Sequence, residues 1–513
     1  MTTETLLLLV PEIVLVVVAV AMYVAGAFVD AEKAWAGLAG GAVLLAAAIL
    51  WGQSPSSAAG PIDSDALAYF ARWFALVFGG LFVLLASQPP RRLGAPEYVG
   101  SLLLVIVGLM LTSVAADLVL LFVALELISI PTYILLALGR GGIDAQESTA
   151  KYFFLSVLSS AVLLYGFTFL YGMAGSTQFS DIRAAMFLAI GLETGPDTLL
   201  RLALVFVLAG LAFKIAAVPF HFYAPDVYQG TTDANAALLS VVPKAAGMVV
   251  LVRLLTLSTW DLTPYGWRTF FALAVVTMTL GNVVALWQTN LRRLLAYSSI
   301  AHAGYMLIGL TVALAPAEAA QGWDGISALL FYLGVYGFAT LGTFAALSYL
   351  APSYRQLEAV DELAGLARTR PWVAAALGLF MFSLAGIPPL AGFWGKVVLF
   401  GSALSVDTGM DAAGTLRPWF IALAVIGAVN AAIAAAYYLR IIAVMYFRSP
   451  TTTLKAEGGA GAGWALAICA TLVVLLGLFP EPLRRGADQA SPTAVAADAA
   501  PEATVMTFDI QNR

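Results

Sequence analysis

Four ionisable side chains, one carboxylate and three amines, lie deep inside long apolar stretches of the sequence. They are Glu126, Lys214, Lys244 and Lys396. If such a stretch crosses a lipid bilayer, a charge near its centre costs roughly 2.5–3.5 kcal/mol on insertion scales. A side chain kept at that depth is usually paired, or it carries protons or ions along a pathway. We therefore predict that these four residues form a row of proton sites.

Proton transfer along such a row depends on how neighbouring groups stabilise each charge. Burial disfavours the charged form of a lysine, and a nearby carboxylate favours it. At about 4 Å and an effective dielectric constant near 20, one such pair is worth ~4 kcal/mol. Movement of Glu126 toward or away from Lys214 is therefore predicted to make that lysine hold or release a proton. Lys244 and then Lys396 would continue a lateral relay through ordered water and His302.

Three further side chains are candidates for a secondary proton path: His302, His221 and Lys151. Each has a structural alternative. Either histidine can satisfy a local hydrogen bond, and Lys151 begins an apolar stretch from which its amine is better placed to reach the membrane surface than to relay protons. The four central residues have an alternative as well, because buried ion pairs can serve only to fix helix packing.

The composition indicates which elements must position these side chains. Of the 513 residues, 61% are hydrophobic and 11% are charged, whereas a soluble domain has ~45–50% apolar and ~25% charged residues. These values exclude a soluble globular enzyme, a disordered chain and a nucleic-acid-binding protein. With one cysteine, Cys469, and two histidines, the sequence lacks the ligands that haem, iron–sulfur clusters and Cys/His zinc sites require. We expect no cofactor and no metal site in this chain.

The hydrophobic pattern predicts an all-α polytopic membrane protein with about fourteen transmembrane helices. A spanning helix needs ~20 mostly apolar residues, and Gly, Pro and charged residues separate such runs. The expected spans are 5–29, 34–52, 66–87, 97–115, 117–139, 147–172, 196–218, 234–257, 265–286, 293–315, 323–350, 371–405, 417–447 and 461–480. Residues 481–513, rich in Ala, Pro, Thr and Asp, are expected to form a flexible tail.

Two of these spans are predicted to be discontinuous helices. Proline removes a backbone donor and clashes with the preceding turn, and Pro219 interrupts span seven as Pro388 and Pro389 interrupt span twelve. A pair of broken helices, one in each half of a chain, is a sign of inverted repeats. We therefore predict two inverted five-helix repeats. The expected units are helices 1–3 at 1–96, helices 4–8 at 97–257, helices 9–13 at 258–447, helix 14 at 448–480 and the tail at 481–513.

The distribution of basic residues predicts an orientation in the membrane. Loops on one side carry more Lys and Arg than loops on the other, where 53–65 and 316–322 carry none. Cytoplasmic loops are enriched in these residues. We therefore predict a bacterial plasma (inner) membrane protein with both termini on the outer, periplasmic side. The first span lacks the basic start of a signal peptide and is expected to be retained.

At the ionisable residues the sequence resembles the antiporter-like subunits of respiratory complex I. The stretch 213–230, Phe-Lys-Ile-Ala-Ala-Val-Pro-Phe-His-Phe-Tyr-Ala-Pro-Asp-Val-Tyr-Gln-Gly, is similar to the seventh-helix signature of that family. Its Pro-Asp-Val-Tyr-x-Gly ending resembles the subunit N branch, whereas the other branches have a Trp-Leu-Pro-Asp-Ala form. The runs at 124–127, 294–305 and 383–389 fit the same family.

The resemblance implies a proton-translocating membrane subunit of NADH:quinone oxidoreductase, an enzyme complex whose redox centres lie outside this chain. Glu126 and Lys214 would be the coupling pair, Lys244 the central lysine and Lys396 the terminal lysine of the half-channel. FMN, iron–sulfur clusters and quinone would belong to partner subunits. The implied partners are the neighbouring antiporter-like subunit, the small membrane subunits, the peripheral subunits and the lipid bilayer, and no nucleic acid.

The sequence departs from the family pattern beside the first helix break. Gln229 stands where the family usually has an acid, and Thr-Thr-Asp at 231–233 replaces a small residue followed by proline. These departures concern the loop and leave the lysines in place.

Two other functions fit part of the same pattern. An Mrp-type cation/proton antiporter subunit would bind sodium through carboxylates, whereas the buried set here is dominated by lysine. A non-conducting membrane scaffold subunit would tolerate Ala or Met at Lys214, Lys244 and Lys396 with little loss of coupled pumping.

Overall fold

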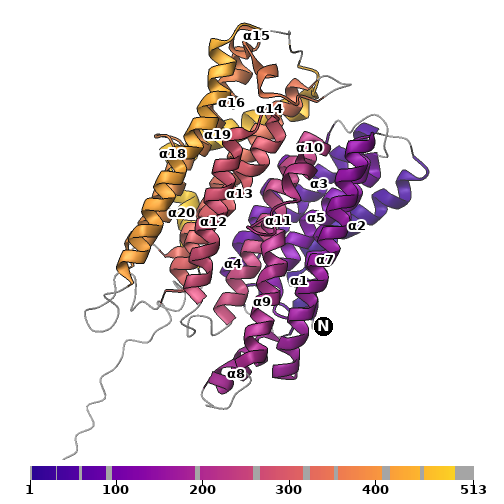
Figure 1. The fold of residues 1–513 in the computed structure, drawn as a ribbon. Helices are drawn as coiled ribbons and strands as arrows, with labels where there is room; N and C mark the ends of the chain where they lie inside the picture. Colours follow the sequence, from indigo (N-terminus) through magenta and orange to yellow (C-terminus); the bar gives the residue numbers. More distant parts are fainter. Residues whose placement is uncertain are drawn as a thin grey trace, which may run out of the picture.

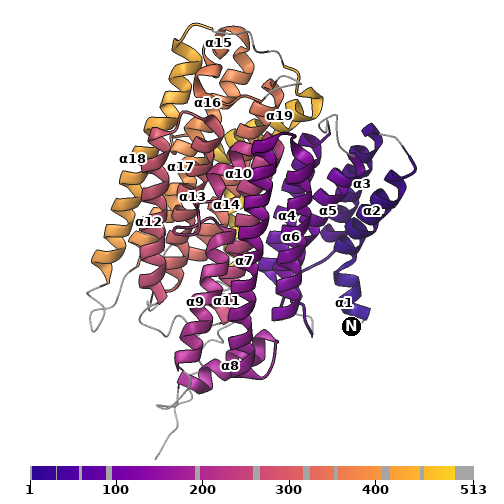
Figure 2. The same ribbon diagram turned by 45° about the vertical axis from the view of Figure 1, so that its right-hand side comes forward.

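Long helices with a common axial direction make up the structure (Figures 1 and 2). The computed structural model describes residues 3–29, 32–56, 60–87, 95–190, 197–257, 266–315, 324–351, 356–406, 416–450, 454 and 456–491. Within these residues there are isolated β-bridges but no strand. The helices are α1 (Thr3–Leu8), α2 (Val10–Gly26), α3 (Glu32–Trp51), α4 (Ala66–Leu85), α5 (Ala95–Val114), α6 (Leu118–Gly139), α7 (Ile143–Ala174), α8 (Phe179–Ile190), α9 (Asp197–Lys214), α10 (Ala224–Gly230), α11 (Asp233–Leu257), α12 (Gly266–Trp287), α13 (Leu291–Ala313), α14 (Gly325–Leu350), the 3₁₀ helix η2 (Val360–Leu363), α15 (Leu366–Thr369), α16 (Pro371–Ala385), α17 (Ala391–Leu404), α18 (Arg417–Phe447), α19 (Gly459–Leu478) and α20 (Glu481–Ala490).

Eleven helices in the described part of the chain are long and apolar enough to cross a membrane. They are α3 to α7, α11 to α14, α18 and α19, and α2, α16 and α17 are shorter apolar helices. This result confirms the all-α polytopic class. The total of about fourteen spans stays a prediction, because two of the expected spans are divided between shorter helices. A third, 196–218, corresponds to α9, which is not among the eleven.

The most deeply buried helices are α14 and the two helices, α11 and α13, that carry Lys244 and His302. The most apolar stretch of α14 is entirely buried, and 94% of the corresponding stretch is buried in α11 and α13, against 33% in α3, α18 and α19. Large apolar side chains such as Leu44, Phe154 and Val425 are exposed on outer helices, as expected where lipid is the solvent. α14 packs against α11, α13 and α17, which carry Lys244, His302 and Lys396.

Both predicted helix interruptions are present. α9 ends at Lys214, and Ala216 then adopts a φ of 56° in the turn that leads to α10. α16 ends at Ala385, and Gly386 follows it in the left-handed conformation with a φ of 89° before α17 begins. The prolines explain why neither stretch continues as one helix, since each lacks an amide donor for the preceding turn. The inverted-repeat arrangement and its boundaries stay predictions.

Part of the predicted flexible tail is helical. α20 occupies Glu481–Ala490, and Leu483, Ala487 and Ala490 share one face at i, i+4 and i+7 that packs against the core. Ser327 of α14 also donates a hydrogen bond to the carboxylate of Asp488. The prediction was therefore wrong for these residues, because the overall composition concealed a small apolar face. Residues 492–513 lie outside the described residues.

Candidate proton relay

Glu126 and Lys214 meet at the end of α9. Glu126 lies on α6, and its Oε1 is 3.8 Å from Lys214 Nζ. The hydroxyl of Ser160, on α7, donates to Glu126 Oε1 at 2.5 Å. Lys214 Nζ in turn donates to Ser160 Oγ at 3.3 Å and to Ser129 Oγ at 2.7 Å. Because a hydroxyl both donates and accepts, the amine is connected to the carboxylate directly and through Ser160.

A close approach of two helices places Lys214 beside the helix that carries the next amine. A Cβ atom on Gly247 of α11 would lie 2.5 Å from Ile215 Cγ2 and 3.6 Å from Lys214 Cβ. Gly247 follows Lys244 by about one helical turn. The first and second lysines therefore lie on adjacent segments at neighbouring levels of the bundle, although their amines have different polar partners.

Lys244 is bound by a group of hydroxyls. Its buried Nζ donates to Ser299 Oγ of α13 at 2.6 Å. The same hydroxyl lies 2.6 Å from the hydroxyl of Tyr336 on α14 and 3.5 Å from that of Tyr228 on α10. No carboxylate in the described ranges lies within ion-pair distance of this amine. Ser299 therefore joins the central lysine to three other helices through groups that can pass a proton.

His302 connects the Lys244 network with the far side of the bundle. Its Nδ1 lies 2.6 Å from the hydroxyl of Tyr332, and its Nε2 lies 3.0 Å from the hydroxyl of Tyr438 on α18. The ring of Tyr336, whose hydroxyl continues the Lys244 network, lies 4.9 Å from the imidazole centroid. An imidazole with a hydroxyl on each nitrogen can take up a proton on one side and release one on the other.

Lys396 lies on α17 and turns back toward the broken end of α16. Its Nζ donates to the carbonyls of Leu384 and Ala385 at 2.9 and 2.8 Å. The helix ends there because Gly386 leaves the α-helical conformation, so these carbonyls have no amide partners further along the helix. The amine also lies 5.2 Å from the ring centroid of Tyr305. A helix C-terminus and an aromatic face both stabilise a cation.

The structure thus places the four predicted residues in two groups. Glu126 and Lys214 form the first group. Lys244 and Lys396 form the second with His302, because Ser299 and Tyr336 lie between Lys244 and the imidazole and the ring of Tyr305 contacts both Lys396 and the imidazole. Their roles in proton transfer stay predictions.

The two remaining candidates lie apart from these groups. His221 is half-buried in the turn between α9 and α10, and its Nδ1 has no hydrogen-bond partner among the residues that the structure describes. Lys151 is 41% exposed, and its Nζ lies 2.7 Å from Glu147 Oε1 and 2.9 Å from Asp226 Oδ2. A surface ion-pair role for Lys151 agrees with this geometry.

The hydroxyl groups that connect the amines were not predicted from the sequence. A signal was present, because Ser129 follows Glu126 by three residues and Ser299 precedes His302 by three, which is the spacing of neighbours on one helix face. The tyrosines gave no such signal, since their positions beside the lysines depend on how distant helices pack.

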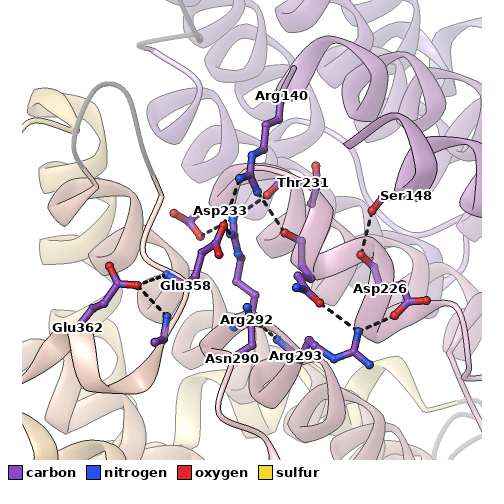
Figure 3. Close-up of polar contacts among 12 residues, drawn as sticks. Arg140, Ser148, Asp226, Thr231, Asp233, Asn290, Arg292, Arg293, Glu358 and Glu362 are labelled. Atoms are coloured by element: carbon purple, nitrogen blue, oxygen red, sulfur yellow. Dashed lines mark hydrogen bonds and ion pairs between the residues drawn. The ribbon is translucent and has the colours of Figure 1, made fainter. Parts of the chain in front are cut away.

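A cluster of charges at the ends of α6, α10, α11 and α13 was also missed (Figure 3). Arg293 Nη1 donates to Asp226 Oδ1 at 2.5 Å, and Lys151 binds the other oxygen. Partial burial alone would raise the pKa of the Asp226 carboxyl, but the hydrogen bonds from Lys151 and Arg293 lower that pKa below its ordinary value. These contacts tie α10 to α7 and α13.

The described residues contain no group of three or more His, Cys, Asp or Glu side chains that could hold a metal ion. The expectation that this chain binds no cofactor stays a prediction.

Comparisons with known proteins find relatives of this chain in sequence and in fold. Residues 115–437 match the family described as NADH:quinone oxidoreductase/Mrp antiporter, transmembrane. NADH-quinone oxidoreductase subunit N of Rhodospirillum rubrum is 35% identical over 96% of this chain and 98% of its own. A chain of respiratory complex I from Thermus thermophilus with bound aureothin has a TM-score of 0.75 and 32% identity, covering 93% of this chain and 98% of that one. A chain of the Mrp complex from Dietzia sp. DQ12-45-1b has a TM-score of 0.78 at 22% identity, covering 96% and 97%, and shares the fold alone.

Proposed function

The chain belongs to the NADH-quinone oxidoreductase subunit N family, and we propose on that basis that it translocates protons as a membrane subunit of NADH:quinone oxidoreductase. The enzyme is the whole complex, of which this chain is one subunit. Electron transfer would take place in other subunits. The observation that carries the proposal is the buried row of Lys214, Lys244 and Lys396, with hydroxyl and imidazole groups beside the amines.

Proton transfer would begin at the Glu126–Lys214 pair. While the carboxylate is near, it stabilises the ammonium form of the lysine, and when it withdraws the buried charge loses that support and the proton leaves. Moving one charge against 100 mV costs ~2.3 kcal/mol, and an ion pair at this separation is worth ~4 kcal/mol. The energy difference between the paired and the separated states of one such pair is therefore large enough to move one proton against that potential. Ser160 would keep the carboxylate aligned.

The second group would carry the proton onward. Lys244 accepts it and passes it to Ser299, from which Tyr336 and His302 lead toward α17. Lys396 then holds the proton at the carbonyl end of α16 until it is released. Ordered water would complete the steps between groups that do not touch, as it commonly does between buried polar groups.

The energy for pair separation would come from partner subunits. FMN, iron–sulfur clusters and quinone are assigned to them in this proposal, and the nearest partners would be the adjacent antiporter-like subunit and the small membrane subunits. The names of the relatives, which are subunits of this oxidoreductase, support it. We place the chain in a bacterial inner membrane with both termini outside and with the five-helix repeats predicted above.

The antiporter and scaffold alternatives are less well supported. Hard cations such as sodium are held by oxygen ligands, and an ammonium group offers none. The buried groups of the relay are mainly amines, and the likeness to the Mrp chain extends to the fold alone. A scaffold subunit would need no chain of hydroxyls between its lysines.

Proton pumping by Lys214→Met in the reconstituted complex tests the proposed function. Methionine keeps the length and apolar stem of lysine but cannot carry a proton. We expect NADH-driven acidification to fall by about a hundred-fold, the usual effect of removing a positioned proton donor. NADH oxidation should fall with it if coupling is tight, because protonation gates the redox step.

Lys33→Met provides the matched control, because Lys33 lies in the first turn of α3, far along the sequence from the relay. It should leave both rates unchanged. Wild-type pumping by Lys214→Met, in a complex assembled at normal yield, would contradict the proposed function and favour the scaffold alternative. Exchange of sodium for protons by the isolated chain would favour the antiporter.

A further inference from the structure

At the α10 end of the bundle, a partly exposed carboxylate is followed by charged side chains that are buried (Figure 3). The side chain of Glu358 is 47% exposed, that of Asp233 is 3% exposed and that of Arg292 is fully buried. Arg292 Nη2 lies 3.8 Å from Glu358 Oε1, and Nη1 lies 3.9 Å from Asp233 Oδ1. Arg140 binds Glu358 Oε1 at 3.2 Å and adds a second positive charge. Charged groups therefore form a continuous series from outside to inside.

The inner pair of this series, Asp233 and Arg292, makes no close hydrogen bond. Asp233 Oδ1 and both Nε and Nη2 of Arg292 have no hydrogen-bond partner within the described part of the chain. A direct bond between an arginine and a carboxylate is usually ~2.7–2.9 Å long, which is much shorter than the distance here. Buried polar atoms that lack a protein partner are generally hydrogen-bonded to ordered water. The geometry therefore indicates a hydrated pair that reaches the surface through Glu358.

One face of α11 leads from this pair to the central lysine. Asp233, Ala237, Ser240 and Lys244 are spaced at i, i+4, i+7 and i+11, which places them on one side of the helix. The distance along the axis is about 16 Å at 1.5 Å per residue. Ala237 and Ser240 are both fully buried, and the carbonyl of Ser240 accepts a hydrogen bond from Tyr336 at 3.3 Å.

α10 links the two ends of that face. The carbonyl of Thr231, just beyond α10, accepts a hydrogen bond from Arg292 Nη1 at 2.8 Å. Three residues earlier, the hydroxyl of Tyr228 lies 3.5 Å from Ser299 Oγ, the partner of Lys244. A displacement of α10 therefore changes the surroundings of the charged pair and of the lysine together.

We infer that Asp233 is the proton-uptake carboxylate that loads Lys244. This inference rests on the proposed function, in which Lys244 receives a proton from Lys214, and adds a second supply to the same amine from the aqueous side. The carboxylate accepts a proton from water beside Glu358 and becomes a neutral acid. It passes that proton through water along the α11 face to the neutral amine of Lys244, which becomes an ammonium, and Asp233 returns to the carboxylate. Arg292 is a positioning residue that holds the carboxylate between transfers.

Asp233→Asn in the reconstituted complex tests this inference. The amide keeps the size of the side chain but cannot carry a proton, so we expect NADH-driven pumping to fall by about ten-fold or more. Asp233→Glu retains a carboxylate and should restore most of the pumping. Asp361→Asn is the matched control, because it makes the same change at an exposed ion pair with Arg448 and should have no effect.

A second variant distinguishes proton uptake from a purely structural ion pair. Asp233→Asn leaves Arg292 buried without a counter-charge, and the double variant Asp233→Asn/Arg292→Gln removes that charge. A structural pair predicts that the double variant recovers pumping, which would overturn the inference, whereas proton uptake predicts that it does not. Normal pumping by Asp233→Asn would also overturn it. In that case Lys244→Met separates the two proposals. If Lys244→Met blocks pumping, only this inference fails. If Lys244→Met pumps normally, the proposed function fails as well.

Discussion

The three buried lysines differ in the groups that hold their amines. Lys214 has a carboxylate at 3.8 Å and two serines, Lys244 has a serine, and Lys396 has two helix-end carbonyls and an aromatic face. These surroundings give each amine a different dependence on conformation. The charge on the Lys214 amine depends on the position of Glu126, and that on the Lys244 amine depends on hydroxyl rotation. The charge on the Lys396 amine depends on the shape of the helix break in the twelfth span. A relay needs such differences, because identical sites would give a proton no direction.

Asp226 provides a pH prediction at the same scale. Some carboxyls have a lower pKa in the folded protein than their unfolded value of ~3.9. Such a carboxyl stabilises the fold at pH values above ~3.9, and this stabilisation is lost as the pH falls through the folded-state pKa. Because Lys151 and Arg293 lower the pKa of Asp226, we expect the amides of α10 to keep their hydrogen-exchange protection between about pH 8 and about pH 5. Asp226→Asn should reduce that protection at neutral pH.

Glu147→Gln is the matched control for this prediction. It removes the other carboxylate partner of Lys151 but leaves the Asp226–Arg293 hydrogen bond intact. Protection should therefore change less than in Asp226→Asn. Equal protection in Asp226→Asn and in the unchanged protein would show that these ion pairs do not hold α10.

At the scale of elements, the two helix breaks were the most predictable feature and the most consequential one. Pro219, Pro388 and Pro389 indicated both interruptions, because proline cannot continue an α-helix. The sequence did not show that Lys396 would turn back onto the carbonyls of α16, since this contact depends on the path of the chain between α16 and α17. It also did not show that Asp233 and Glu358, far apart in sequence, would face one arginine.

Gly386→Ala tests the break in the twelfth span. Gly386 has a φ of 89°, and an added Cβ would lie 2.8 Å from Lys396 Cδ. The left-handed conformation costs a non-glycine residue roughly 1–2 kcal/mol, so we expect a lower melting temperature of the purified complex and slower pumping. Gly378→Ala, within α16 and with nothing closer than 3.9 Å to the added Cβ, should leave both unchanged. Equal effects of the two substitutions would contradict a specific role for the break.

At the scale of the whole molecule, the sequence was sufficient for the class of protein and for the depth of the ionisable residues. Apolar runs predicted the spanning helices, and lysines within those runs predicted buried amines. The connections between amines could not be predicted, because Ser299, Tyr336 and Tyr438 come together only when α13, α14 and α18 pack. The helix α20 within the predicted tail was not expected. Its apolar face is too short to be recognised in a segment that is otherwise polar.

The most direct test is an experimental density map of the assembled complex at a resolution that shows ordered water. We predict water molecules between Lys214 and Lys244, between Asp233 and Lys244, and between His302 and Lys396, so that every amine lies on one hydrogen-bonded path. Dry apolar packing between Lys214 and Lys244 or between His302 and Lys396, with no hydroxyl or water within hydrogen-bonding distance, would contradict proton transfer through this chain. The same packing between Asp233 and Lys244 would contradict only the uptake of protons through Asp233.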